Sequence, residues 1–345
     1  PIGRTRTLPA PNSQPQQLAL ATVSCQNYEH GYYPAYRHLA EEDLDFVLHL
    51  GDYIYEYAAK PDSTHPRQHI GAETIDLDGY RLRYAQYKSD PDLQAAHAAF
   101  PFICTWDDHD VENDYANDQS ENFDPAEQFL RRRAAAYQAY YEHLPLRPLS
   151  QPQGTQMQLY RRFAFGRLAE FSVLDTRQYR SDQACPTPEK GGGRLLTDCA
   201  ERLDPTRTML GEEQERWLFE GLSQSRSSWN VIAQQYLVSQ FKQKSEGQTA
   251  YWSECWDGYP VSRQRILDFL AQQQPSNPIF LGGDIHSFWV SDLKQDFDDP
   301  NSAIVASEFV CTSISSAGIP YDRIAPLLPD SPHVRFFDSR QRGYI

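Results

Sequence analysis

The sequence predicts a layered α/β fold in which helices cover the sheets, and three observations lead to this prediction. Short apolar runs recur along the 345-residue chain and alternate with segments that have helical spacing. Hydrophobic residues make up 40% of the chain, which is enough for a large core. Polar side chains follow the apolar runs directly, at the position where ligand sites form in open α/β sheets. Strands that alternate with helices favour helices packed on sheet faces.

The individual elements follow from local patterns. Asp124 precedes Pro125, which favours an N-cap and a first-turn proline in a helix that runs to about residue 143. Apolar residues at helical spacing predict two further helices, at 211–223 and 260–272. The predicted strands are the apolar runs at 18–23, 46–50, 102–106, 168–174, 229–233 and 278–281.

Composition argues against two classes of protein. No run approaches the roughly 18 consecutive apolar residues that a membrane-spanning helix needs. The chain has 32 basic and 47 acidic residues, a net charge of −15, and no basic stripe, which argues against a nucleic-acid-binding module. A solvated acidic surface accounts for most of these acids. An enzyme for an anionic substrate would nevertheless need bound cations at so acidic a site.

The six cysteines show no CxxC spacing, which argues against zinc ribbons and thioredoxin-like redox sites. Cys185 and Cys199 flank a polar, glycine-rich stretch, and we expect a disulfide that closes this surface loop in an oxidising compartment. Two free thiols are the alternative. Cys104 and Cys311 lie in apolar runs and are expected to be buried packing residues.

A first candidate site begins where the second apolar run ends in Gly51 and Asp52. An aspartate at a strand end can bridge two cations through its two oxygens. Tyr55 follows three residues later, and its phenolate oxygen would be a hard donor that suits ferric iron. The pair Gly-Asp also forms ordinary turns, so this motif is weak by itself.

Carboxylates crowd the stretch 107–114, together with His109 and Asn113. Ionised carboxylates this close repel one another, so the cluster needs counter-ions. The apolar run before it indicates that its first residues are partly buried, which favours metal binding over a solvated acidic loop. Asp284 and His286 follow another apolar run, and side chains two residues apart on an extended segment point to the same side. A core histidine is the usual alternative for such a pair.

These motifs recur within longer strings: VSCQ at 23–26, HLGDYIYEY at 49–57, TWDDHDVEND at 105–114, LDTRQYRSDQ at 174–183, MLGEEQERWL at 209–218, WDGYP at 256–260 and GGDIHSFW at 282–289. Together they resemble the calcineurin-like metallophosphoesterases, and more closely their PhoD-type branch, the secreted alkaline phosphatase D and phosphodiesterase family. The resemblance covers most of the chain. It implies an α/β/β/α sandwich with helices covering two mixed sheets. The catalytic domain would span 18–345 and follow a linker-like segment at 1–17.

The resemblance also implies a set of metal ligands. One ferric ion would be held by Cys25, Asp52, Tyr55 and His286. One or two calcium ions would be held by Asp52, Asp108 and Asp284, with Asn113 as a further ligand and Asp107 and Gln235 as weaker candidates. Asp108 and Asp284 stand where the wider superfamily has an asparagine and a histidine, and calcium takes oxygen ligands almost exclusively.

His109 and Arg177 are the expected catalytic residues. By resemblance, His109 would donate a hydrogen bond or a proton to the phosphoryl or leaving oxygen. Arg177 would clamp the phosphate, with Arg180 in reserve. A structural ion pair with an acidic neighbour is the alternative for either arginine. The expected reaction is hydrolysis of phosphodiesters or phosphomonoesters by metal-activated water at alkaline pH.

Two other functions stay open. One is a phospholipase D-like diesterase of the same family, and the other is a calcium-binding module without catalysis. The expected substrate is a small or polymeric phosphate ester, and the protein is expected to be a monomer. By resemblance, and because of the expected disulfide, we expect it to be secreted, periplasmic or on the cell surface.

Overall fold

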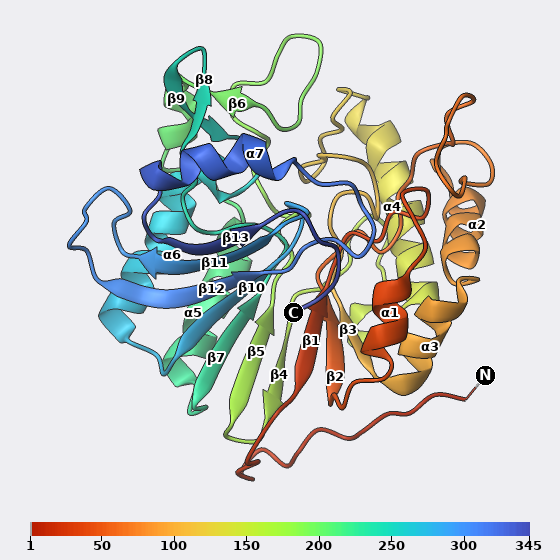
Figure 1. The fold of residues 1–345 in the computed structure, drawn as a ribbon, viewed down its shortest axis with the longest axis horizontal. Helices are drawn as coiled ribbons and strands as arrows, with labels where there is room; N and C mark the ends of the chain where they lie inside the picture. Colours follow the sequence, from red (N-terminus) through yellow and green to blue (C-terminus); the bar gives the residue numbers. More distant parts are fainter. Residues whose placement is uncertain (1) are drawn as a thin grey trace.

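The computed structural model describes residues 2–345, and within them two main sheets lie side by side with helices on their outer faces (Figure 1). The strands are β1 (Leu20–Val23), β2 (Phe46–His49), β3 (Phe102–Cys104), β4 (Arg161–Phe165), β5 (Ala169–Val173), β6 (Leu195–Leu196), β7 (Trp229–Ala233), β8 (Gln243–Ser245), β9 (Gln248–Trp252), β10 (Pro278–Gly282), β11 (Phe288–Lys294), β12 (Ile304–Val310) and β13 (Val334–Asp338). The α-helices are α1 (Pro34–Leu39), α2 (Leu77–Tyr87), α3 (Pro91–Ala99), α4 (Ala126–His143), α5 (Gly211–Gln224), α6 (Pro260–Gln273) and α7 (Tyr321–Ile324). Short 3₁₀ helices lie at Pro148–Ser150, Ala200–Leu203, Trp256–Gly258 and Ala325–Asp330.

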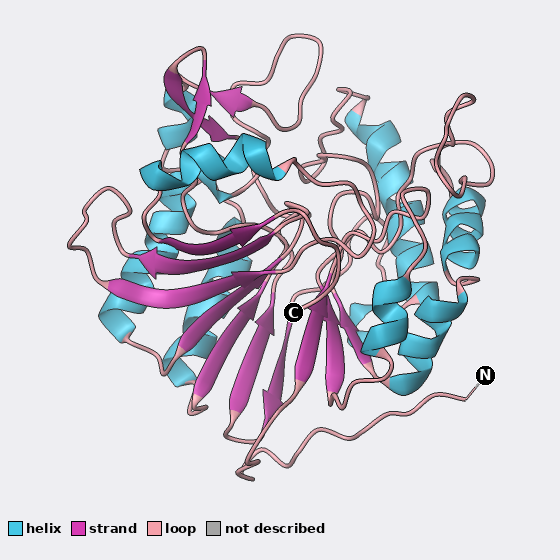
Figure 2. Ribbon diagram, viewed as in Figure 1, coloured by secondary structure: helices cyan, strands magenta, loops and turns pink. Residues whose placement is uncertain are grey.

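The smaller main sheet has the order β1-β2-β3 and is parallel throughout. The larger has seven strands in the order β13-β11-β12-β10-β7-β5-β4. Its central strands β5, β7, β10 and β12 are parallel, and the strands toward its two edges are antiparallel to their neighbours. A third, antiparallel sheet of β6, β9 and β8 lies apart from these two (Figure 2).

Alternating side chains build the layers. In β2, Phe46 and Leu48 face the core between the two main sheets, whereas Val47 faces the core under helices α1–α4. In β7, Val231 faces the inter-sheet core and Ile232 packs with α5 and α6. Because successive strand residues point to opposite faces, each sheet is buried on both sides. The order of layers is therefore helix, sheet, sheet, helix, as expected.

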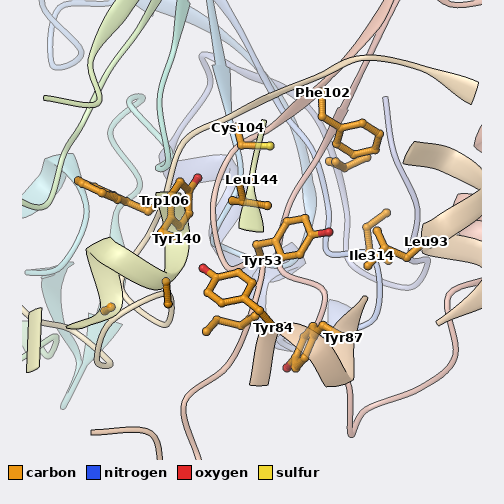
Figure 3. Packing of buried hydrophobic residues seen from close by; sticks show 14 of the residues in the cluster. Tyr53, Tyr84, Tyr87, Leu93, Phe102, Cys104, Trp106, Tyr140, Leu144 and Ile314 are labelled. Atoms are coloured by element: carbon orange, nitrogen blue, oxygen red, sulfur yellow. The ribbon is translucent and has the colours of Figure 1, made fainter. Parts of the chain in front are cut away.

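The core under α1–α4 is rich in tyrosine (Figure 3), and several of the tyrosine hydroxyl groups contact polar partners. Tyr53 Oη lies 2.8 Å from His97 Nε2, and Tyr84 Oη donates to Asp110 at 3.5 Å. Trp106 stacks on Tyr137 with ring centroids 4.1 Å apart. This packing fixes the loops that follow β2 and β3, because Tyr53, Trp106 and Asp110 all belong to them.

The six predicted strands and three predicted helices are present, with ends shifted by no more than a few residues. The N-cap is a correction: helix α4 begins at Ala126, Pro125 occupies the N-cap position, and Asp124 instead accepts a hydrogen bond from Ser120 Oγ at 3.0 Å. The smaller main sheet differs in one detail from the expectation of two mixed sheets, because its described strands are all parallel.

Residues 2–17 run extended across the ends of the sheets opposite the polar loops (Figure 1). Arg4 N donates to the carbonyl of Ala98, and Arg6 pairs with Asp45 at 2.6 Å. Whether this segment links to a separate domain stays a prediction. At the other end of the chain, the backbones of Ile345 and Thr22 exchange two hydrogen bonds beside β1.

The expected disulfide between Cys185 and Cys199 is present. Cys104 and Cys311 are buried free thiols, as expected for packing residues. Among the described residues, no helix is both long and apolar enough to cross a membrane.

Candidate metal and catalytic site

The polar residues singled out from the sequence meet in one crevice, at the carboxyl ends of the parallel strands of both main sheets. Parallel strands end at a common edge, so residues far apart in sequence become neighbours there. The contributing loops follow β1, β2, β3, β5, β7 and β10, and bring Cys25, Asp52, Asp107, Asp108, His109, Arg177, Gln235, Asp284 and His286 to this edge.

One end of the crevice gathers donors of several chemical kinds. Ligand atoms of Cys25, Asp52 and His286 lie within 4.8 Å of one another. Tyr55 joins them: its hydroxyl donates to Asp52 Oδ2 at 2.9 Å and lies 3.4 Å from His286 Nε2. The Nδ1 of His286 donates to the carbonyl of Ala317 at 2.7 Å, which leaves Nε2 as the nitrogen that faces the cluster. We name this group the Cys25 end.

The backbone is strained where it presents these ligands. Cys25, Asp52, Asp284 and His286 all have positive φ, at 57°, 56°, 62° and 53°. The left-handed region is uncommon for residues other than glycine, and such residues cluster at functional sites. Gly51, at φ 115°, is required for a different reason: a Cβ there would lie 2.7 Å from the backbone nitrogen of Asp107. The glycine lets the loops after β2 and β3 approach closely.

The other end of the crevice is built from carboxylates. Ligand atoms of Asp107, Asp108 and Asp284 lie within 4.8 Å of one another, and Asp52 and Asp108 form a second such group with His109. Three of these buried oxygens accept no hydrogen bond from the described residues: Asp52 Oδ1, Asp107 Oδ2 and Asp108 Oδ1, the last of which lies 3.3 Å from the guanidinium of Arg177. Native proteins rarely bury a carboxylate oxygen without a partner. A cation bound among these oxygens would satisfy them. We name this group the carboxylate end.

Arg177 lies entirely inside the protein behind the carboxylate end. Its guanidinium contacts Asp107 at 2.7 Å and Asp108 at 3.3 Å, and it also pairs with Glu254. Arg180 is equally buried and pairs with the second oxygen of Glu254 at 2.6 Å. The structure therefore places both arginines in ion pairs with acidic neighbours, and neither presents an exposed face to a phosphate. This arrangement favours the alternative of a structural ion pair.

His109 lies where the two ends meet. Its Nδ1 donates to Glu56 Oε2 at 2.8 Å, and its ring stacks on Tyr55 with centroids 4.1 Å apart. Burial by itself would lower the pKa of His109, but Glu56, Asp108 and Asp52 raise it well above its ordinary value. The structure brings His109 into the site and favours its protonated form.

The remaining candidates have different surroundings. Asn113 lies at the edge of the cluster, where its side-chain nitrogen donates to Glu121 at 2.8 Å. Both polar atoms of the Gln235 amide are hydrogen-bonded within the protein: its oxygen accepts from Thr176 Oγ1 at 2.6 Å, and its nitrogen donates to the carbonyl of Trp106 at 2.7 Å. Gln235 therefore holds loops together and has no free oxygen aimed at a cation.

Burial and mutual repulsion raise the pKa values of most of these acids. Burial, and to a smaller extent the neighbouring aspartates, raise the pKa of Asp52 well above its usual range. The pKa of Asp284 is raised for the same reasons. Burial raises the pKa of Asp107 to about 7. At Asp108 burial acts in the same direction, but Arg177 and His109 outweigh it and lower the pKa. Bound cations would favour the ionised form of all four.

Three residues of the site were not predicted from the sequence. Glu56 holds His109 and the backbone nitrogen of Asn113, the latter at 2.8 Å. Asp110 accepts from the backbone nitrogens of Asp52, Tyr53 and Asp107 at 3.0 to 3.1 Å. Glu254 joins the two buried arginines. Glu56 and Asp110 lie inside the quoted motifs, but sequence spacing does not separate ligands from residues that position them.

A layered α/β sandwich with clustered oxygen, sulfur and nitrogen donors at its strand ends defines a metalloprotein with a multi-ion site. The model of the PhoD-like phosphatase family matches residues 20–345, and the chain belongs to this family. Alkaline phosphatase D of Bacillus subtilis (strain 168) is 49% identical over 351 residues, which cover 100% of this chain and 59% of that protein. A solved structure of PhoD matches with a TM-score of 0.94 at 48% identity, over 100% of this chain and 66% of that one. The chain thus spans about three-fifths of the length of its curated relative.

Proposed function

We propose that this chain hydrolyses phosphate esters, either phosphodiesters or phosphomonoesters or both, at alkaline pH. The observation that carries the proposal is the convergence of the Cys25 end and the carboxylate end on the shared Asp52, where the buried oxygens Asp52 Oδ1 and Asp107 Oδ2 have no partner among the described residues. Membership of the PhoD-like phosphatase family and the name of the relative from Bacillus subtilis support the same activity.

The donor sets differ enough to assign different cations to the two ends. We assign one ferric ion to Cys25, Tyr55 and His286 together with Asp52, since thiolate, phenolate and imidazole suit a transition metal. We assign one or two calcium ions to Asp52, Asp108 and Asp284, because calcium takes oxygen ligands. Asn113 stays a proposed outer ligand. When bound, these cations would supply Lewis acidity and lower the pKa of a coordinated water.

The chain's own residues prepare the reaction around that centre. His109 is held by Glu56, and the neighbouring carboxylates raise its pKa, so we assign it the hydrogen bond or proton that the departing oxygen needs. In the net reaction, an oxygen of water bonds to phosphorus, the ester P–O bond breaks, and the released alcohol takes up a proton. Arg177 acts as a positioning residue, because it fixes Asp107 and Asp108 and reaches no open space.

A calcium-binding module without catalysis fits the site less well. Structural calcium sites use oxygen ligands, and they have no use for a thiol and an imidazole. Cys25 and His286 lie in the same cluster as Asp52, which favours a catalytic centre of mixed donors. We further propose that the protein works outside the cytoplasm, in keeping with the disulfide between Cys185 and Cys199.

The test is hydrolysis of a chromogenic phosphodiester and the corresponding phosphomonoester at alkaline pH, before chelation, after chelation and after calcium is restored. We expect activity that is lost with the chelator and returns with calcium, and the ratio of the two rates will rank the substrate classes. Absence of turnover of either ester, in protein with iron and calcium bound, would contradict the proposal.

A further inference from the structure

A pocket of about 310 Å³ opens beside the candidate site and shares two of its residues, Asp284 and His286. Its volume is at the lower end of the range for small-molecule sites. Its lining includes residues of α7 and of the small sheet of β6, β8 and β9, elements that lie close together in the ribbon (Figure 1). Asp284 is only partly buried and belongs both to the lining of the pocket and to the carboxylate end, so the pocket and the site share this side chain.

The walls of this pocket are mostly apolar. They are formed by side chains from separate parts of the chain, namely Leu195, Leu237, Phe241, Trp252, Ile285 and Ile319. Trp252 is 38% exposed even though it is among the largest side chains of the protein. An apolar concave surface that is open to water next to a catalytic centre is typical of a ligand-binding site.

The charges around the pocket do not favour a second anionic group. Arg323 on α7 is the one lysine or arginine among the described residues of its lining. Asp257 is also in the lining, but its carboxylate is bound to Arg263 at 2.7 Å and to the backbone nitrogen of Phe241 at 2.9 Å. Asp284 adds negative charge at the inner wall. A nucleotide or polyphosphate arm would meet too few positive groups here.

We propose that this pocket binds an uncharged, apolar alcohol arm of the phosphate ester while the phosphate lies at the metal site. The inference rests on the proposed function and narrows its substrate class to esters with an alkyl or aryl arm. An ester arm is one bond away from phosphorus, so it must occupy space next to the metal ligands. The shared wall of Asp284 and His286 puts the apolar pocket at this position.

The test is calorimetric titration of the metal-loaded protein with alkylphosphonates from methyl to hexyl, which cannot be hydrolysed. Because burial of one methylene contributes about 0.8 kcal/mol, we expect Kd to fall about fourfold for each methylene that enters the pocket. Trp252→Ala and Ile319→Asp should flatten this dependence. Trp229→Ala is the matched control, since Trp229 is 42% exposed but lies at the start of β7, at the far end of the strand from the site.

A Kd that does not change with chain length in the wild-type protein, or a dependence that survives both pocket variants, would overturn the inference. Circular dichroism of each variant confirms that it is folded, and either pocket variant is sufficient for the test. Because the titration measures binding, its outcome is independent of turnover. If Kd does not change with chain length in a protein that hydrolyses esters, only the pocket assignment is contradicted. If Kd falls with chain length but no ester is hydrolysed, only the proposed function is contradicted.

Discussion

At the Cys25 end, a thiol, a phenol and an imidazole surround Asp52, and main-chain groups such as the carbonyl of Ala317 orient them. At the carboxylate end, aspartates lie against the buried arginines Arg177 and Arg180, and Glu254 joins the two arginines. The backbone positions the side chains of the first end, and ion pairs with buried arginines position those of the second.

This difference in donor type bears on the cations that we propose for the two ends. At the Cys25 end burial lowers the pKa of His286 to about 4, so the imidazole is neutral and available as a ligand at any pH above that value. At the carboxylate end the ion pairs fix the carboxylates in place, while Asp107 Oδ2 accepts no hydrogen bond from the described residues. In the proposed assignment, donor chemistry would select the ion at one end, charge would select it at the other, and Asp52 would couple the two.

The largest expected effect comes from removing that coupling. Asp52→Asn replaces one carboxylate oxygen by an amide NH₂ group, which cannot bind a cation. We expect a fall in kcat/KM of at least about a hundredfold, the size expected when a transition-state electrostatic contact is lost. Metal analysis should show that both kinds of cation are reduced. Retention of both cations at full occupancy would show that Asp52 does not join the two ends.

A pair of substitutions separates the two ends directly. Cys25→Ser removes the soft donor, and we expect it to lower the iron content while calcium binding is largely kept. Asp108→Asn removes a charged oxygen, and we expect the reverse. The two variants serve as controls for each other in elemental analysis of the purified proteins. Equal loss of both cations in both variants would mean that the site behaves as one unit.

Glu254→Gln tests the charge balance at the carboxylate end. It leaves two buried arginines without their shared carboxylate, which typically costs about 3 to 5 kcal/mol of unfolding free energy. Denaturant unfolding measures this loss. Glu213→Gln, on the exposed side of α5, is the control and should change stability by less than about 0.5 kcal/mol. A stability of Glu254→Gln equal to the control would show that the arginine pairs are dispensable.

The smallest effect concerns the support of the Cys25 end and depends on pH. His97 on α3 contacts Tyr53, the neighbour of Asp52, and burial lowers the pKa of His97 to about 3. The unfolded chain therefore takes up a proton from about pH 6.5 downward while the folded protein does not, so stability is lost as the pH falls below 6.5. We expect a loss on the order of 1 kcal/mol per pH unit.

His97→Gln should make this acid dependence shallower, because the group that titrates only in the unfolded chain is removed. Denaturant unfolding at pH 7, 6 and 5 measures the slope. His38→Gln, at an exposed position near the end of α1, is the matched control and should retain the wild-type slope. An unchanged slope in His97→Gln would show that His97 is not responsible for acid sensitivity near the site.

The sequence by itself determined the fold class and most of the candidate ligands. Its apolar runs predicted the parallel strands β1, β2, β3, β5, β7 and β10, because period and composition are local properties. The runs at β11, β12 and β13 were not predicted. Cys25, Asp52, Asp108, Asp284 and His286 follow predicted strands, and the common carboxyl edge of parallel strands brings them together.

The tertiary structure decided which of the charged residues face one another. The family resemblance implied that Arg177 clamps the phosphate, but its environment makes it the buried partner of Asp107 and Glu254. Glu254 comes from a loop more than seventy residues away, and no local pattern encodes that contact. Local spacing fixes which side chains leave a strand end together, whereas charge pairing and burial depend on what the rest of the chain packs behind them.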